Sequence, residues 1–146
     1  MELQTFIDEN KENYLSLLKE KNIYVRKYSQ LGLAIIKAKK NTEYDYQENI
    51  WMRYCRGAVI NTNTHRLVCV PPLKAYFESN LEQIISESNE GDKKVFQPLI
   101  EGTMINMFFH DDEWMISTRS NIGGKNSWDG KVPFNTMFKE IAGTEW

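Results

Sequence analysis

Residues 94–109, with the sequence KVFQPLIEGTMINMFF, have the pattern of an active-site strand. A turn at Glu101, Gly102 and Thr103 opens onto a mostly apolar run at residues 104–109. Glycine has no Cβ, so it lets the backbone pass close to a ligand. The pattern favours a ligand-binding strand that begins at Glu101 and Gly102, and ordinary turn chemistry is the alternative.

Two other segments carry side chains suited to a phosphorylated ligand. Arg119, in WMISTRSNIGG, has a planar guanidinium that can hold a phosphate through two parallel hydrogen bonds. Tyr76 and Phe77 could stack on a base, which is worth about 1–3 kcal/mol per base. The alternatives are a cross-strand pair with an acid for Arg119 and packing beneath a sheet for the aromatic residues.

Other notable side chains favour structural roles. His65 and His110 each lie beside a predicted turn, without a sequence neighbour that would make either one a metal ligand or a base. Trp114 and Trp128 are expected to be core residues or loop anchors. Cys55 and Cys69 are too few for a disulfide framework and are not spaced as zinc ligands, so we expect reduced, mostly buried thiols.

Length and composition indicate one globular domain over residues 1–146. The chain is 41% hydrophobic and has no apolar run near the ~20 residues of a membrane span. Its first residues are acidic and polar, which is not the pattern of a signal peptide. We therefore expect a cytoplasmic protein with no membrane association.

The charges are unevenly distributed, although the formal net charge is only −2. Residues 19–40 carry seven Lys or Arg and one acid, whereas residues 78–92 carry five acids and no base. The basic stretch could face phosphates. The alternative is a solvated strand face.

Hydrophobic periodicity predicts an α+β fold with mainly antiparallel sheets and flanking helices. Helices are expected at 2–21, 81–88 and 134–141, the last with Phe134, Met137, Phe138 and Ile141 on one face. Strands are expected at 22–28, 31–40 and 114–119, with a hairpin over 57–72. Residues 95–102 and 103–109 are expected to form two strands, or one strand with a break. A glycine-rich loop is expected at 120–131.

Four segments in order resemble the nucleotidyltransferase domain of the T4 RNA ligase 1 family. YCRGAVINTNTHRLVCVPPLKAYF contains the first two, a CRG run like the one that begins a strand of the family and a run like the P-x-x-K-F-F-N that ends it. LIEGT is similar to the nucleotidyl-lysine motif Lys-x-Asp-Gly, and WMISTRSNIGG to the downstream S-T-K-G-S strand. The likeness covers residues 50–125, and it is closer still to RNA-ligase-like domains encoded by large DNA viruses. It implies a partial domain of this fold, without the later motifs.

The departures from this family concern its lysines. Leu99 stands where the nucleophilic lysine should be, and it has no nucleophilic atom. Ala75 takes the place of the lysine in K-F-F-N, with Lys74 one residue early and so on the other face of an extended segment. Arg119 replaces the lysine of S-T-K-G, and arginine differs from lysine in geometry and in always being charged. Together these changes predict a catalytically inactive relative.

The resemblance implies a ligand-binding site formed by seven residues: Arg56, Tyr76, Phe77, Leu99, Glu101, Gly102 and Arg119. Arg56 would lie near the nucleotide phosphates, or else form a surface salt bridge. The expected ligand is RNA or a nucleotide, and an mRNA 5′ end or cap is a natural guess by analogy. No catalytic residue, metal or cofactor is expected, whereas a protein partner or homodimer is.

Two other functions stay open at this stage. The chain could be a protein-interaction subunit whose pocket is blocked by its own side chains, Leu99 among them. Less favoured is a fragment of an active RNA ligase, since Lys93 and Lys94 would lie ~16–20 Å from the position of Leu99 along a strand. Nucleotide binding separates the first of these from a binding domain, and covalent label transfer tests the second.

Overall fold

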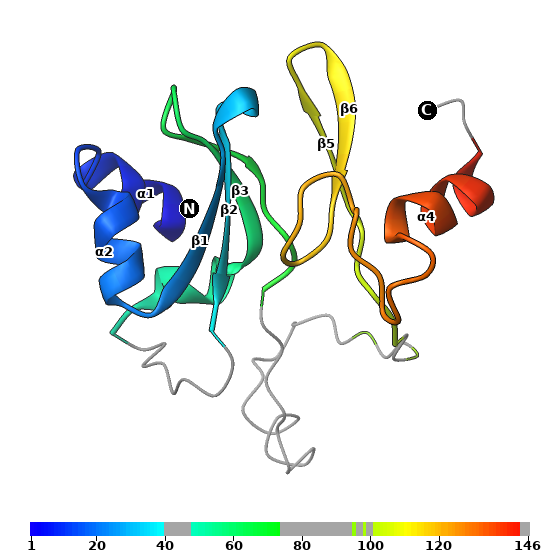
Figure 1. The fold of residues 1–146 in the computed structure, drawn as a ribbon. Helices are drawn as coiled ribbons and strands as arrows, with labels where there is room; N and C mark the ends of the chain where they lie inside the picture. Colours follow the sequence, from blue (N-terminus) through cyan, green and yellow to red (C-terminus); the bar gives the residue numbers. More distant parts are fainter. Residues whose placement is uncertain (40–47, 74–94, 96–97, 99–100, 144–146) are drawn as a thin grey trace, which may run out of the picture.

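The computed structural model describes residues 1–39, 48–73, 95, 98 and 101–143 (Figure 1). The predicted helix at 81–88, half of the predicted strand at 95–102, and the site residues Tyr76, Phe77 and Leu99 lie outside the described residues.

The described part of the chain contains two antiparallel sheets. The first has the order β1-β2-β3-β4, with β1 at Ile23–Tyr28, β2 at Leu33–Ala38, β3 at Arg56–Asn61 and β4 at Arg66–Cys69. The second is a hairpin of β5, Asn106–His110, and β6, Glu113–Ser117. The predicted α+β class with mainly antiparallel sheets is confirmed.

Two helices cover one face of the first sheet. α1, Glu2–Glu9, and α2, Tyr14–Glu20, pack their apolar side chains against β1, β2 and β3 and the short 3-10 helix η2 at Ile50–Tyr54. Leu3, Ile7 and Leu18 are fully buried there. Burying a side chain of this size contributes about 1.5–3 kcal/mol, so this layer is a large part of the core.

The prediction of a single helix over 2–21 is wrong, because the chain turns between α1 and α2. The Asn10 side chain donates to the carbonyl of Phe6 at 2.8 Å, and the Asn10 carbonyl accepts from the N–H groups of Asn13 and Tyr14. Asparagine side chains compete for backbone hydrogen bonds in this way and favour turns over helix interiors.

The β5–β6 hairpin packs on the opposite face of the first sheet (Figure 1). Leu33, Ile35 and Val59 point from the first sheet into this layer, where they meet Phe108 of β5 and Ile122. The hairpin itself turns at Asp111 and Asp112, whose φ angles of 48° and 61° suit the tight two-residue turns that connect twisted strands. Through Ile122 this layer holds the turn that follows β6.

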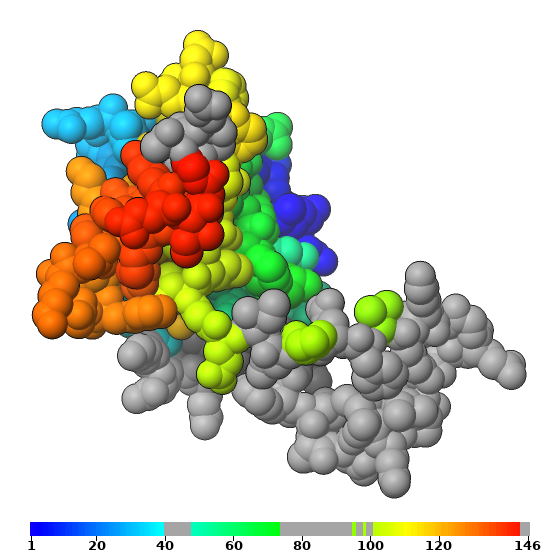
Figure 2. Space-filling view, turned by 90° about the vertical axis from the view of Figure 1, so that its right-hand side faces the viewer, coloured from blue at the N-terminus to red at the C-terminus, as the bar shows by residue number. Residues whose placement is uncertain are grey.

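The last described helix, α4 at Phe134–Ala142, docks through its first turn. The Phe134 and Asn135 N–H groups donate to the carbonyls of Asn126 and Gly124 at 2.9 and 3.0 Å. Figure 2 shows this helix and the loop before it covering one face of the molecule, with the tip of the β5–β6 hairpin projecting beyond them. Phe134 is buried as predicted and Met137 and Phe138 are half-buried, but Ile141 is 88% exposed, so the predicted apolar face is open at its end.

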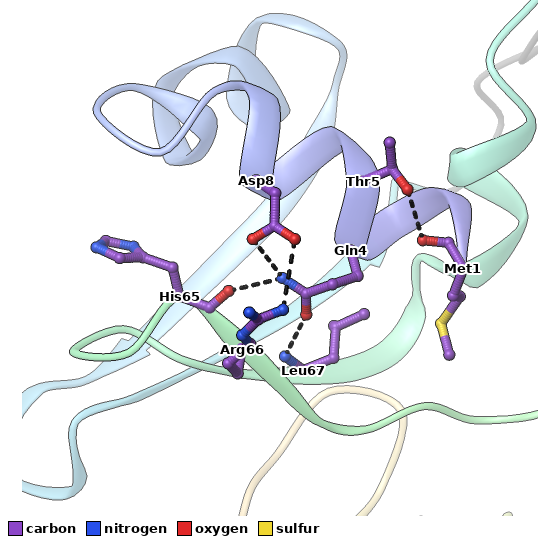
Figure 3. Close-up of polar contacts among 7 residues, drawn as sticks. All are labelled: Met1, Gln4, Thr5, Asp8, His65, Arg66 and Leu67. Atoms are coloured by element: carbon purple, nitrogen blue, oxygen red, sulfur yellow. Dashed lines mark hydrogen bonds and ion pairs between the residues drawn. The ribbon is translucent and has the colours of Figure 1, made fainter.

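One edge of the first sheet is sealed by a side chain of α1. The Gln4 amide donates to the carbonyl of His65 at 2.9 Å and accepts from the N–H of Leu67 at 2.8 Å (Figure 3). These two groups belong to β4 and the turn before it, on the side away from β3. Gln4 therefore replaces part of a neighbouring strand, and Asp8, which bonds both Gln4 and Arg66, reinforces the contact.

We expect Gln4→Leu to destabilise the fold. The substitution keeps the size of the side chain but leaves the Leu67 N–H and the His65 carbonyl without their partner, which costs about 1–3 kcal/mol. Thr5→Ala on the same helix is the control, since the exposed Thr5 hydroxyl bonds only its own helix and a change within about 0.5 kcal/mol is expected. Urea unfolding of the three proteins measures the difference, and equal midpoints would show that Gln4 does not stabilise the edge.

Candidate functional site

A basic pocket lies where β1 and β2 meet the turn that follows β6. Its volume is about 480 Å³, within the ~300–1,000 Å³ of ligand pockets. The described residues that line it are Tyr24, Lys37, Ala38, Lys39, Arg119 and Ser120. Three of these six side chains are cations, and they come from two segments that lie about eighty residues apart in the sequence.

The sheet supplies the aromatic wall of the pocket. Tyr24 of β1 is the register partner of Lys37 of β2, so both side chains lie on one face. This is the face opposite α1 and α2, because Ile23, the neighbour of Tyr24, is buried beneath the helices. The Lys37 Nζ lies 5.2 Å from the centroid of the Tyr24 ring, and Tyr24 is 41% exposed. The pair offers a ring and a charge to a ligand.

Arg119 is held at the tip of a tight turn. The Thr118 N–H donates to the Asn121 carbonyl at 2.9 Å, and Ser117 forms a β-bridge with Ile122, so Arg119 and Ser120 form the tip between them. The guanidinium Nη2 lies 3.5 Å from the carbonyl of Ala38, at the end of β2. The turn thus places Arg119 directly above the strand that carries Lys37.

A glycine in β3 makes room for this turn. The β2–β3 register passes from Ile36 opposite Ala58 to Lys37 opposite Arg56, which leaves Gly57 as the extra residue of a β-bulge. Gly57 has a φ of 108°, and a Cβ built there would lie 2.8 Å from the Cα of Arg119. Only glycine suits both the backbone angle and the close approach.

We therefore expect Gly57→Ala to cost about 3 kcal/mol or more, from the strained φ and the clash with the Arg119 backbone. Gly130→Ala is the matched control, because its φ of 78° is also positive but nothing lies within 4 Å of the added Cβ. The control should cost only about 1–2 kcal/mol. Denaturant unfolding compares the two variants, and an equal loss would mean that the turn moves away from Gly57 without cost.

Of the predicted site residues, Arg119 lines the pocket and Arg56 lies beside it. Arg56 is the register partner of Lys37, but its guanidinium Nη1 donates to the carbonyl of Leu73 at 3.2 Å and is not among the lining groups. Glu101 and Gly102 are exposed. Thr103, the next residue, lines a smaller pocket of about 240 Å³ that it shares with Arg119.

Sequence reasoning missed Tyr24, Lys37 and Lys39 as individual site residues. A signal for them was present, because they belong to the basic stretch at 19–40 and Tyr24 alternates with Arg26 and Tyr28 along one strand face. What the sequence did not show is which face of β1 the helices would cover. Without knowing the covered face, the sequence could not distinguish a solvated strand face from a phosphate-binding one.

Cys55 and His110 are both held in structural roles. Cys55 is fully buried, and burial raises the pKa of its thiol to about 12, so it stays protonated at neutral pH. The buried His110 donates from Nε2 to the carbonyl of Leu31 at 2.9 Å, which joins β5 to the 3-10 turn η1 at Ser29–Leu31. Within the described residues, no group of three His, Cys, Asp or Glu could hold a metal ion.

Two tryptophans are more exposed than the sequence suggested. Trp114 is 52% exposed and contacts Phe109, itself 55% exposed, on the outer face of the β5–β6 hairpin. Trp128 is 74% exposed and its ring packs edge-on against Phe134, so it anchors the loop before α4 as predicted. Trp114 is not a core residue, because its strand position faces away from the sheet–sheet layer.

The protein partner or homodimer expected from the sequence stays a prediction. The exposed pair of Phe109 and Trp114 is a candidate contact surface for such a partner, since apolar patches often mark interfaces. Sedimentation velocity of the purified chain should show a species larger than the monomer at micromolar concentration, reduced by Trp114→Ser. A monomer at all concentrations would contradict self-association.

No helix among the described residues is long and apolar enough to cross a bilayer. No protein-family model, curated protein or solved structure matches this chain. The function is therefore argued from the geometry of the pocket, with the resemblance in sequence as a second and separate line of reasoning.

Proposed function

We propose that this chain binds a nucleotide or RNA in the basic pocket and does not transfer nucleotidyl groups. The observation that carries the proposal is the convergence of Lys37, Lys39 and Arg119 around the ring of Tyr24. Cations attract phosphate, and a tyrosine ring offers a surface on which a base can stack. A ligand with both a phosphate and a flat ring satisfies both features, and an mRNA 5′ end or cap belongs to this class.

The expected energies suit a specific ligand. Hydrogen bonds to charged groups contribute about 1.5–3 kcal/mol each, and stacking a base on an aromatic ring contributes about 1–3 kcal/mol. The Arg119 side chain is the best placed of the cations, because the tight turn and Gly57 fix its backbone before a ligand arrives. Such pre-organisation lowers the entropy cost of binding.

We expect Arg119→Ala and Lys37→Ala each to weaken the binding of a nucleotide or short RNA by about tenfold or more, since each removes a charged partner of phosphate. Lys27→Ala is the matched control, because Lys27 is exposed and its position in β1 faces away from the pocket. Its affinity should stay within about twofold of the unsubstituted chain.

Isothermal titration with ATP, GTP, a cap analogue and short RNAs measures these values. Equal affinities for all four proteins would place the ligand elsewhere, and no binding to any of these probes would refute the proposal.

Arg56→Ala tests the position predicted from the sequence. If the Arg56 guanidinium stays on the Leu73 carbonyl when a ligand binds, the loss should be smaller than for Arg119→Ala.

We expect no covalent transfer of a nucleotide to the chain. Leu99 occupies the position that the resemblance assigns to the nucleophilic lysine, and Cys55 is buried and protonated. Incubation with α-labelled ATP or GTP and a divalent metal, followed by denaturing electrophoresis, should leave the protein unlabelled. A phosphoramidate on any lysine would show an active enzyme. Leu99→Lys alone should also stay unlabelled, because Ala75 and Arg119 still replace the other two lysines.

A further inference from the structure

A second pocket is lined by residues of the same strand, β1. Its volume is about 610 Å³, and its described lining includes Arg26 and Tyr28 of β1 on one side and Asn121, Ile122 and Lys125 on the other. The first pocket lies between Tyr24 of the same strand and Arg119 and Ser120 of the same loop. The two pockets therefore lie between the same two segments, β1 on one side and residues 119–125 on the other. We call the two pockets together the groove.

The strand wall carries an alternating row of rings and charges. Tyr24, Arg26 and Tyr28 lie on one face because side chains of a strand alternate, and the row spans about 13 Å at ~3.3 Å per residue. Lys37 lies over the Tyr24 ring and Arg26 over the Tyr28 ring, each at 5.2 Å from the ring centroid. The same pairing of a cation with a tyrosine thus occurs in both pockets.

The loop wall is held in place by hydrogen bonds of its own. The Tyr28 hydroxyl accepts from the Ile122 N–H at 3.0 Å, which ties the loop to the end of β1 beside the second pocket. The Lys125 N–H donates to the Asn121 side chain at 3.1 Å, and the Gly123 N–H to the Ile116 carbonyl at 2.7 Å. Tyr28 is committed to this structural contact, which leaves the more exposed Tyr24 as the ring available for stacking.

We infer that the ligand of this groove is a single-stranded polynucleotide that runs along β1. One nucleotide stacks on Tyr24 with its phosphate at Arg119 and Lys37, and the next phosphate lies between Arg26 and Lys125. A mononucleotide would occupy only the first of these two cationic pockets. A duplex holds its bases inside the helix, so it could not offer one to Tyr24, whereas single strands bind through grooves that combine cations with stacking rings.

This inference rests on the proposed function, and the experiment separates the two. Fluorescence anisotropy and competition measure the affinities of uridine monophosphate, hexauridylate, hexadeoxythymidylate and a duplex RNA. Hexauridylate or hexadeoxythymidylate should bind at least about tenfold more tightly than the monophosphate and more tightly than the duplex. Preference for either six-nucleotide strand supports the inference and tells RNA from DNA.

The double variant Arg26→Ala/Lys125→Ala should weaken binding of the six-nucleotide strand about tenfold and leave that of the monophosphate within twofold. It should also reduce the slope of log affinity against log salt by about 0.7, since Arg26 and Lys125 share one phosphate and each phosphate contact of a single strand contributes ~0.7. Lys27→Ala/Lys131→Ala removes the same charge outside the groove and is the control. Thermal unfolding of both variants confirms that they are folded.

The outcomes distinguish two failures. If the monophosphate binds and the six-nucleotide strands bind no more tightly, or if the duplex binds as well as they do, the inference is overturned and the proposed function stands. If the double variant and its control lose equal affinity, the strand does not follow β1 and the inference is also overturned. If no probe binds, the proposed function fails with it.

Discussion

The close approach of one backbone to another at Gly57 is the contact on which the rest of the site depends. The turn that carries Arg119 can lie over the end of β2 only because β3 presents no side chain at this point. A bulge in the β2–β3 register supplies both the extra residue and the positive φ. The apolar layer between the sheets then holds the turn in place, with Leu33, Ile35 and Val59 packed against Phe108 and Ile122.

This arrangement explains why the charges gather where they do. The helices determine which face of β1 and β2 is buried beneath them. They cover Ile23 and Ile36, so Tyr24 and Lys37 point to the opposite face, toward the second sheet. On the face toward the second sheet, apolar side chains fill the middle, and polar side chains lie at the end beside Arg119. The cations therefore line the end of the layer, beside the turn, and they do so without interrupting the core.

The sequence predicted the elements better than it predicted their neighbours. The β3–β4 hairpin, the β5–β6 hairpin and α4 all lie where alternation and turn residues indicated, because those signals are local. The break at Asn10 was missed because an asparagine side chain that bonds its own backbone looks, in a periodic pattern, like one polar position. Among the described residues near the pocket, Arg119 was predicted from the likeness of WMISTRSNIGG to the S-T-K-G strand, whereas Tyr24 required knowledge of the covered face. That knowledge is tertiary, and periodicity alone does not contain it.

The seal that Gln4 forms along β4 has a consequence for the order in which the chain assembles. The bond from the Leu67 N–H to the Gln4 side chain joins groups 63 residues apart, so it closes a long loop. Local pairing of β3 with β4 has no such delay, since the two strands are joined by a short turn. We therefore expect β4 to pair with β3 before Gln4 docks, so that the outer edge of β4 is bare for a time. In that interval another chain competes with α1 for the same hydrogen-bonding groups, so intermolecular strand addition depends on concentration while docking of α1 does not.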